Sequence, residues 1–389
     1  SLTNATDVSN QESLVNMSRL SRILNETTAT DVIFTRFLKD VDLNKYLDNE
    51  IIKDNLFQLQ KNQKSAKYLL TEKEEVLYSK LRQVSSSSWG QIQSLLTAKL
   101  DVEVDNKILT LSEVRNLAYD NNQKVRKEAY EAELKAYEKI DEVVATALSN
   151  IKREVVMMNE LRGYEGVLEP TLIRSNMQEH TLTAMIEAML EFRPHFAKYL
   201  KAKSKYLGHS NGLPFYDMFA PVGKLEKTYT YEEAQEVIIN SFNSYSEKLG
   251  SYAKKAFDSN WIDPFPKKGK RGGAFCSNQP QIKQSRILSN FTGSLSDVQT
   301  LAHELGHGYH GEIISENSPL NWSYPMPLAE TASIFCETIV ANHLLSELTN
   351  DEERLSVLEI ALQGDTQVIV DILSRYIFET NIFKLAEGP

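Results

Sequence analysis

The feature that most constrains the fold is a spacing of three and four residues between apolar side chains over long stretches of the chain. The run from Ser112 to Arg153, rich in Ala, Glu, Lys and Leu, places these side chains on one stripe of a helix. The stripe consists of Tyr130, Leu134, Tyr137, Ile140, Val144 and Leu148. Such a stripe is typical of a helix packed on a protein core, and a coiled-coil partner helix is the alternative. We therefore expect most of the chain to be helical.

Three stretches interrupt the helical pattern. Residues 100–111 have apolar residues on either side of Asp105-Asn106, a pair that favours a tight turn, and they predict a short hairpin. Residues 208–227 and 258–293 are rich in Gly and Pro and are expected to be non-helical. Serines 85–88 are expected to connect two helices. A domain boundary at the hairpin gives an N-terminal helical domain over residues 1–110 and a second domain over residues 111–389.

Composition excludes several classes of protein. The 389 residues, 41% of them apolar, can bury a sizeable core, and a net charge of −10 disfavours a nucleic-acid partner. No apolar run approaches the roughly 20 residues of a membrane span, and the first residues lack the pattern of a signal peptide. The two cysteines, Cys276 and Cys336, cannot form a disulfide framework, and Cys336 is expected to be buried among apolar neighbours. We expect a cytoplasmic monomer with no membrane partner.

One segment carries metal chemistry, the sequence H-E-L-G-H from His303 to His307. Histidines four residues apart lie on one face of a helix, where both imidazoles can bind one tetrahedral ion. Glu304 directly follows the first histidine and can reach a water molecule on that ion. Ser296 starts a capping-box pattern, which predicts that the helix begins seven residues before His303. The segment therefore predicts a metal-binding helix.

A catalytic zinc ion usually has three protein ligands and one open position. In one known arrangement a third histidine follows six residues after the second, with a glycine midway, but Ile313 and His310 occupy those positions. In another, a second helix supplies a glutamate. Glu330 fits this arrangement, because prolines end a loop just before it and it lies 23 residues after His307, which leaves room for an antiparallel return.

Four further features surround these candidates. Glu337, seven residues after Glu330, is a candidate partner for the second nitrogen of a ligand histidine, and a solvated acid is the alternative. His310 is expected to have a supporting role. Residues 286–293 are expected to form a strand, either one whose edge pairs with an extended peptide or an ordinary internal strand. The basic, glycine-rich residues 267–273 do not fit a phosphate loop and are expected to form a solvated hairpin.

Several stretches resemble the oligoendopeptidase F branch of the thimet oligopeptidase family of zinc peptidases. They span residues 126–333, and the two most specific are TLAHELGH at residues 300–307 and AETAS at residues 329–333. The others are RKEAYEA from Arg126, YDM from Tyr216, AFD from Ala256, WID from Trp261 and KRGG from Lys270. The resemblance implies a mainly α, two-lobed zincin-like fold, with a small antiparallel sheet beside the active-site helix and a deep channel.

The resemblance also implies a function for residues 111–389, that of a zinc metallopeptidase catalytic domain. It implies one Zn²⁺ per chain, bound by His303, His307 and Glu330, with Glu304 as the catalytic base. The expected reaction is hydrolysis of internal bonds of short, unfolded oligopeptides. The alternatives are a non-catalytic zinc-binding or peptide-binding protein or an inactive fragment on the same scaffold, and a helical interaction protein without metal.

One departure from the family concerns the C-terminal end. Family members continue beyond residue 389, and the additional part carries a histidine and a tyrosine that help to stabilise the oxyanion. In this sequence the last histidine is His343, and Tyr376 is the only tyrosine after it, so no counterpart is assigned. Either the sequence is a fragment that lacks the C-terminal part of the catalytic domain, or the protein lacks that assistance.

Overall fold

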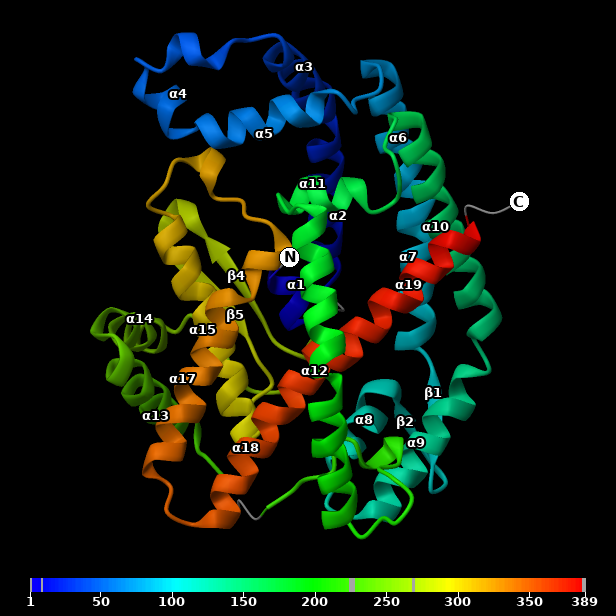
Figure 1. The fold of residues 1–389 in the computed structure, drawn as a ribbon, viewed down its shortest axis with the longest axis vertical. Helices are drawn as coiled ribbons and strands as arrows, with labels where there is room; N and C mark the ends of the chain where they lie inside the picture. Colours follow the sequence, from blue (N-terminus) through cyan, green and yellow to red (C-terminus); the bar gives the residue numbers. More distant parts are fainter. Residues whose placement is uncertain (1, 8–9, 224–227, 268–269, 387–389) are drawn as a thin grey trace. The chain divides into compact units, whose positions relative to one another are not determined.

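The computed structural model describes residues 2–7, 10–223, 228–267 and 270–386. The chain is mainly helical, as predicted, and divides into two compact units (Figure 1). The first unit comprises residues 1–69 and 224–361, and the second comprises residues 70–223 and 362–389. The domain boundary at residue 110 stays a prediction. Among the described helices, none combines the length and the apolar character that crossing a membrane requires.

The first unit combines helices from both of its stretches with one small sheet. Its α-helices are α1 (Leu2–Thr6), α2 (Gln11–Glu26), α3 (Thr28–Lys39), α4 (Glu50–Asp54), α5 (Leu56–Ala66), α13 (Tyr231–Tyr245), α14 (Glu247–Asp258), α15 (Leu295–Ile314), α16 (Met326–Ala329) and α17 (Thr331–Glu347). Helix α18 (Asp351–Thr366) begins in this unit and continues into the second. The strands are β3 (Ile262–Asp263), β4 (Phe275–Gln279) and β5 (Gln284–Leu288), and short 3₁₀ turns cover Leu43–Tyr46, Pro280–Ile282 and Pro319–Asn321.

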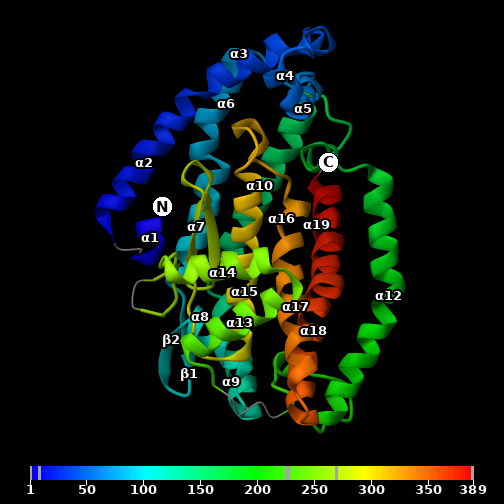
Figure 2. The ribbon, with the colours of Figure 1, turned by 90° about the vertical axis from the view of Figure 1, so that its left-hand side faces the viewer.

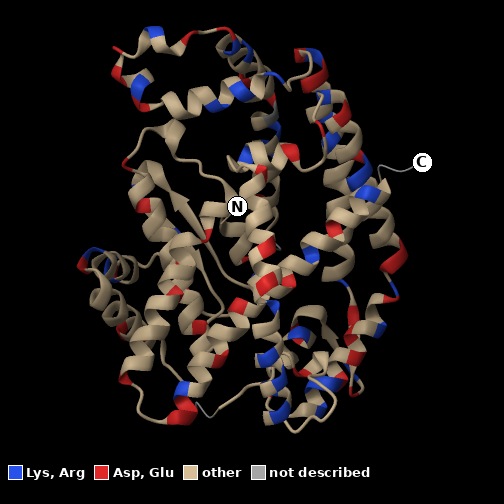
Figure 3. Ribbon diagram, viewed as in Figure 1, with Lys and Arg blue, Asp and Glu red and all other residues tan. Residues whose placement is uncertain are grey.

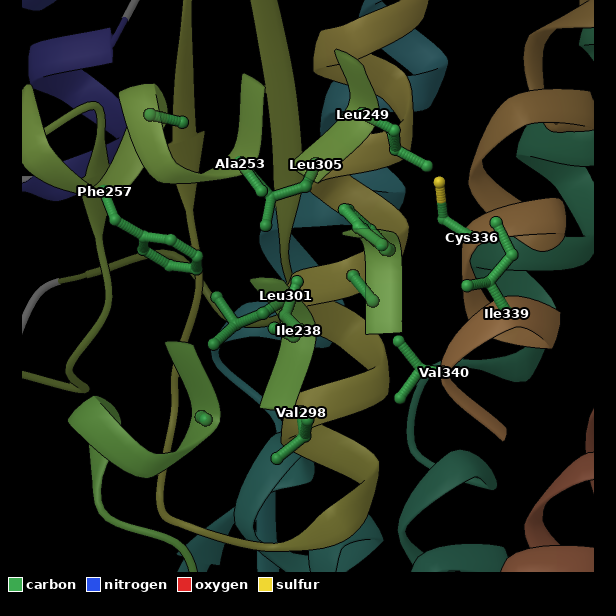
Figure 4. Close-up of a cluster of buried hydrophobic side chains, with 14 of the residues drawn as sticks. Ile238, Leu249, Ala253, Phe257, Val298, Leu301, Leu305, Cys336, Ile339 and Val340 are labelled. Carbon is green, nitrogen blue, oxygen red and sulfur yellow. The ribbon is translucent and has the colours of Figure 1, made fainter. Parts of the chain in front are cut away.

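The core of the first unit surrounds α15, as Figure 4 shows. Val298, Leu301 and Leu305 of α15 are completely buried. They belong to one apolar cluster with Ile238 of α13 and Val340 of α17, which are also completely buried. The helix that carries the H-E-L-G-H sequence therefore has its apolar side fixed on several neighbours.

Helix α15 begins earlier than the sequence pattern predicted. Its N-cap is Ser294, whose Oγ accepts a hydrogen bond from the Asp297 backbone nitrogen at 3.1 Å. The Asp297 carboxylate in turn accepts from the backbone nitrogens of Ser294 and Gly293, at 3.1 and 3.0 Å. The predicted N-cap, Ser296, therefore lies two residues after the observed N-cap, Ser294. Asp297 is the third helical residue, whose carboxylate completes the capping box.

Gly306 lets α15 and α17 pack closely. A Cβ atom at this position would lie 2.7 Å from both the Ala332 carbonyl oxygen and the Ser333 Cα, closer than side-chain carbons approach backbone atoms. The start of α17 can therefore lie directly on α15. Cys336 of α17 is buried, with 3% of its surface exposed, as predicted.

The sheet has the order β3-β5-β4. The expected antiparallel pair is β4–β5, and β3 adds a parallel strand on the other side of β5. Both β4 and β5 contact α15. The strand predicted over residues 286–293 covers Gln284–Leu288 and is central, so its interpretation as a peptide-binding edge was wrong and the alternative, an ordinary internal strand, is correct. Sequence could not show this, because strand order depends on pairing partners distant along the chain.

The basic segment 267–273 is only partly described, since residues 268 and 269 lie outside the described residues. Lys267 and residues 271–273 are exposed, as expected for a solvated segment, but the Lys270 side chain is fully buried. Its Nζ donates hydrogen bonds to the carbonyl oxygens of Asp263 and Phe265, at 2.9 and 2.7 Å. It also lies 3.1 Å from a carboxylate oxygen of Asp263, so its charge is neutralised inside the protein.

The second unit consists of helices and one hairpin. Its α-helices are α6 (Glu72–Val84), α7 (Ser86–Ala98), α8 (Leu111–Asn116), α9 (Gln123–Tyr137), α10 (Asp141–Arg162), α11 (Glu169–Ser175), α12 (Glu179–Tyr206) and α19 (Ile372–Ala386). Short 3₁₀ turns cover Leu117–Tyr119 and Phe215–Asp217, and a π-helical turn, Gln367–Asp371, joins α18 to α19. The strands are β1 (Asp101–Val104) and β2 (Lys107–Thr110), which contact α8 and α9 (Figure 2).

The predicted hairpin is confirmed. Strands β1 and β2 pair antiparallel, and Asp105 and Asn106 form the two-residue turn with positive φ angles of 50° and 60°. Residues 208–223 contain one 3₁₀ turn and no α-helix, as expected, and residues 224–227 of the predicted non-helical stretch lie outside the described residues. The stretch 258–293 supplies the three strands of the first unit, in agreement with the prediction.

Two helical predictions in this unit need correction. The run over residues 112–153 forms α8, α9 and the first part of α10, so its apolar residues do not share one face. Ile140 is buried but Leu134 is 49% exposed, and the buried residues of α9 include Ala129 and Ala136. Of serines 85–88, only Ser85 lies between helices, because α7 starts at Ser86.

The early start of α7 has a local cause. The Glu154 carboxylate accepts hydrogen bonds from the backbone nitrogen and the hydroxyl of Ser86, at 3.0 and 2.9 Å. A carboxylate at a helix N-terminus satisfies free N–H groups and is favoured by the helix dipole. Along the described helices, Lys and Arg are interspersed with Asp and Glu (Figure 3). The absence of a nucleic-acid partner stays a prediction.

Candidate active site

Three candidate ligand atoms converge within the first unit. The Nε2 atoms of His303 and His307, on successive turns of α15, are 3.1 Å apart. The Oε2 atom of Glu330, at the junction of α16 and α17, lies 3.2 Å from the first nitrogen and 3.3 Å from the second. A tetrahedral site with bonds of about 2.0–2.1 Å has ligand atoms roughly 3.3–3.4 Å apart. The three atoms therefore have the separations that a small divalent ion requires.

The donor chemistry also fits a cation. The second nitrogen of His303, Nδ1, donates to a carboxylate, which in the neutral imidazole leaves Nε2 with the lone pair that a metal ligand needs. Ser333 donates a hydrogen bond to Glu330 Oε2 at 2.8 Å, which fixes that oxygen beside the two imidazoles. The lone pairs of the two nitrogens and the negative charge of the Glu330 oxygen repel one another when no ion lies between them. A bound cation would be coordinated by all three atoms.

Glu337 orients the first histidine. Its Oε1 accepts a hydrogen bond from His303 Nδ1 at 2.5 Å, so the predicted contact is present and the alternative of a purely solvated acid is excluded. Burial lowers the pKa of His303, but the hydrogen bond and the charge of Glu337 outweigh burial and raise it overall. Metal-ligating histidines commonly bind a carboxylate through their second nitrogen in this way.

Glu304, the predicted base, is buried with 5% of its surface exposed. Its Oε2 has no hydrogen-bond partner in the part of the chain that the structure describes. Burial, together with the negative charges of Glu330 and Glu337, outweighs the nearby His303 and raises the pKa of Glu304 to about 7. A buried carboxyl group that exchanges its proton near neutral pH is typical of an acid–base catalyst.

Two neighbouring side chains extend the site. The ring of His310 stacks against Tyr324, with centroids 4.5 Å apart and planes at 37°, and its Nδ1 is buried without a hydrogen-bond partner among the described residues. Burial and the charges of Cys276 and Glu330 raise the pKa of Tyr324. His310 thus lies next to Tyr324, and its supporting role stays a prediction. Sequence reasoning missed Tyr324 because no spacing rule connects this loop residue to α15.

Residues of the sheet also hydrogen-bond to α15. Asn278 of β4 donates a hydrogen bond from its side-chain nitrogen to the His307 carbonyl oxygen at 3.1 Å. Its side-chain oxygen accepts a hydrogen bond from the Ser285 hydroxyl of β5 at 2.8 Å. This residue was also not identified from sequence, since a single asparagine in a short strand carries no recognisable signal.

Comparison with known proteins assigns the family. Residues 116–368 match the sequence model of peptidase family M3, and residues 38–101 match that of oligopeptidase F. The chain belongs to peptidase family M3. M3 is a metallopeptidase family, which implies a metal ion. The resemblance to oligoendopeptidase F and the mainly helical fold are both confirmed.

Individual relatives agree with this family. Oligopeptidase PepF of Bacillus subtilis is 26% identical over 326 residues, which are 82% of this chain and 48% of that protein. The chromosomal oligoendopeptidase F of Lactococcus lactis subsp. cremoris is 32% identical over 262 residues, 66% of this chain and 42% of that protein. The structure of oligoendopeptidase-F from Enterococcus faecium, 17% identical, has a TM-score of 0.69 and covers 100% of this chain and 66% of its own. The chain spans about half the length of the curated relatives it matches.

Proposed function

We propose that this chain carries the metal centre of a zinc-dependent endopeptidase that hydrolyses internal bonds of short, unfolded oligopeptides. The observation that carries the proposal is the convergence of two imidazole nitrogens and one carboxylate oxygen within 3.3 Å of one another. Two nitrogen donors and one oxygen donor in a tetrahedral arrangement suit zinc. Membership of family M3 supports peptide hydrolysis, and the oligoendopeptidase relatives support cleavage of internal bonds of short peptides.

In this proposal the residues have separate roles. His303, His307 and Glu330 hold the ion, and Glu337 and Ser333 hold two of these ligands in place. When bound, zinc supplies Lewis-acid chemistry that activates a water molecule and polarises the peptide carbonyl. The Glu304 carboxylate accepts a proton from the attacking water and gives it to the departing amine nitrogen. In the metal-free protein, burial raises the pKa of the Glu304 carboxyl group to about 7, so the group is able to hold a proton near neutral pH.

The main rival is a non-catalytic zinc- or peptide-binding protein, or an inactive fragment, on the same scaffold. Glu304 argues for catalysis, because a structural metal site has no use for a buried carboxylate beside its ligands whose Oε2 has no hydrogen-bond partner among the described residues. A helical interaction protein without metal is disfavoured by the spacing of the three candidate ligand atoms.

Cleavage of a quenched fluorescent peptide by the protein and by its Glu304→Gln variant tests the proposal. We expect a rate about 10²–10⁴-fold lower in the variant, with about one zinc ion per chain retained in both. Glu312→Gln is the matched control, since Glu312 lies on the same helix and pairs with Lys255 instead of the site. Equal rates in the wild type and Glu304→Gln would refute hydrolysis, and less than about a tenth of a zinc ion per chain would refute the metal centre.

Two further properties stay predictions. We expect a monomer in solution, which light scattering tests through the mass of one chain, and a cytoplasmic location. The expected partners are short peptide substrates.

A further inference from the structure

A relay of hydrogen bonds through three side chains ends at the backbone of the candidate ligand His307. Tyr252 of α14 donates from its hydroxyl to Ser285 Oγ of β5 at 3.1 Å. The Ser285 hydroxyl donates to Asn278 Oδ1 of β4 at 2.8 Å, and Asn278 Nδ2 donates to the His307 carbonyl oxygen at 3.1 Å. Tyr252 and Ser285 each have only 2% of their surface exposed. All four residues belong to the first unit, and the function proposed above gives the relay no role.

The direction of these hydrogen bonds is fixed by chemistry. Burial raises the pKa of the Tyr252 hydroxyl above its usual value, so this group stays protonated and can donate. A backbone carbonyl can only accept, so the amide nitrogen of Asn278 must face His307 and its oxygen must face away. That oxygen meets two donors, the Ser285 hydroxyl at 2.8 Å and the Cys276 thiol at 3.5 Å. Each donor therefore has an acceptor, and the relay runs in one direction, toward α15.

Two glycines of α15 leave room for the relay. A Cβ atom on Gly308 would collide with the Tyr252 hydroxyl, and a Cβ atom on Gly311 would collide with the side-chain amide of Asn278. Glycine inside a helix is destabilising relative to alanine, so two of them directly after the second ligand histidine need a reason. The polar side chains that approach the helix at these two positions supply it.

The relay acts on the turn of α15 that carries His307. A carbonyl oxygen has two lone pairs, so the His307 carbonyl can accept from Asn278 in addition to its hydrogen bond within the helix. Glu337 holds the ring of the other histidine, His303, whereas the relay holds the backbone of His307. A shift of this backbone would move His307 Nε2 away from the other two ligand atoms, which lie 3.1 and 3.3 Å from it.

We infer that Tyr252, Ser285 and Asn278 are positioning residues that fix the backbone of His307 and thereby set the metal affinity of the candidate centre. The inference rests on the metal centre of the proposed function, because the position of a ligand matters only if the ligand binds an ion. Metal–ligand distances tolerate changes of only about 0.2 Å, so a small movement of His307 weakens coordination. Breaking the relay should therefore weaken metal binding in a protein that stays folded.

The test measures zinc affinity by competition with a chromogenic chelator. In the cobalt(II)-substituted protein it also records the visible absorption spectrum, which reports coordination geometry. Asn278→Ala removes the last donor and should lower zinc affinity about tenfold or more, with a changed cobalt spectrum. Gly311→Ala keeps every relay side chain but pushes the Asn278 amide aside, so it should have the same effects. Tyr252→Phe removes only the first hydroxyl and should cause a smaller loss of zinc affinity.

Asn290→Ala is the matched control. Asn290 also donates from its side-chain nitrogen to backbone carbonyls, those of Arg271 and Gly273, at 3.0 and 2.8 Å. Neither carbonyl lies on α15, so this variant should keep the zinc affinity and the cobalt spectrum of the wild type. Circular dichroism verifies that each variant is folded.

The outcomes separate the relay from the proposed function. Unchanged zinc affinity and an unchanged cobalt spectrum in Asn278→Ala would overturn the relay. An equal loss of affinity in Asn290→Ala would also overturn it, because a general loosening of the first unit would then explain the result. If the wild type binds zinc but cleaves no peptide, the hydrolytic function fails, yet the affinities still test the relay because they require no turnover. If the wild type binds no zinc, the metal centre and the role of the relay fail together.

Discussion

Each unit buries a carboxylate, and the two carboxylates have opposite surroundings. In the second unit, Asp217 is fully buried and both of its oxygens accept hydrogen bonds. Arg126 Nε donates to Oδ1 at 2.8 Å, and Gln123 Nε2 and His209 Nε2 donate to Oδ2 at 2.8 and 2.5 Å. In the first unit, Glu304 is almost as deeply buried, and its Oε2 has no hydrogen-bond partner among the described residues.

The surroundings move the two pKa values in opposite directions. Burial raises the pKa of Asp217, but the hydrogen bonds from Arg126, Gln123 and His209 outweigh burial and hold it below its usual value. Burial, together with the negative charges of Glu330 and Glu337, outweighs the nearby His303 and raises the pKa of Glu304 to about 7. Burial alone therefore does not identify a reactive group. Removing a partner from a paired buried charge destabilises the fold, and a buried carboxylate oxygen without a hydrogen-bond partner is available for chemistry.

The largest expected effect comes from breaking the satisfied cluster. Arg126→Met leaves the Asp217 charge buried without its main partner and should lower the free energy of unfolding by about 3–5 kcal/mol. Zinc affinity of the folded protein should not change. Urea unfolding at pH 7 measures the first quantity and calorimetric zinc titration the second. The control Arg115→Met breaks the exposed ion pair with Glu133 and should cost no more than about 1 kcal/mol, so equal losses in both variants would contradict the comparison.

A smaller loss of unfolding free energy, accompanied by a loss of zinc affinity, is expected from Gly306→Ala. The added Cβ would meet the backbone of Ala332 and Ser333 at 2.7 Å, so α17 must shift and carry Glu330 with it. We expect a cost of about 1–3 kcal/mol in unfolding free energy together with weaker zinc binding. Gly364→Ala in α18 is the control, since no atom lies within 4 Å of a Cβ there. Unchanged zinc affinity in Gly306→Ala would show that the close contact does not position Glu330.

The Glu337→Gln variant is expected to lower zinc affinity without changing the stability of the core. Replacing the carboxylate that accepts from His303 Nδ1 should lower zinc affinity about 10–100-fold. The metal-free protein should keep its unfolding free energy within about 0.5 kcal/mol. Glu347→Gln, on the same helix but beside His343, should change neither quantity. If both variants bind zinc like the wild type, Glu337 does not support the ligand.

The smallest effect is the acid dependence of the satisfied cluster. Because the pKa of Asp217 is lowered in the folded protein, its ionised form stabilises the fold at pH values above the unfolded-state pKa of about 4. That stability is lost as the pH falls through the lower folded-state pKa. The difference in unfolding free energy between the wild type and Asp217→Asn should therefore shrink on acidification from pH 7 to pH 2.5. A difference that grows on acidification would contradict the assigned direction.

Local sequence patterns predicted more of the candidate site than of the fold. The spacing of His303 and His307, and that of Glu330 and Glu337, follow from helix periodicity, which a sequence displays directly. The Asp105-Asn106 turn is equally local. The central position of β5 and the breaks between α8, α9 and α10 depend on contacts with residues elsewhere in the chain. The spacing of apolar residues therefore does not predict these features.

The satisfied cluster illustrates the same limit. Arg126 and Asp217 both lie in stretches that support the family resemblance, yet nothing in either stretch shows that they pair across 91 positions. Tyr324 was missed for a similar reason. It lies in a loop, and only the three-dimensional course of that loop places it beside His310. Sequence identifies groups capable of chemistry, and only the structure shows which of them are left without partners.

The central claim is that His303, His307 and Glu330 hold one metal ion, and zinc-edge anomalous diffraction from crystals of the zinc-loaded protein tests it most directly. The account predicts one anomalous peak per chain, about 2.0–2.1 Å from His303 Nε2, His307 Nε2 and Glu330 Oε2. A peak at another place in the chain, or none at these three atoms with zinc in excess, would contradict the account.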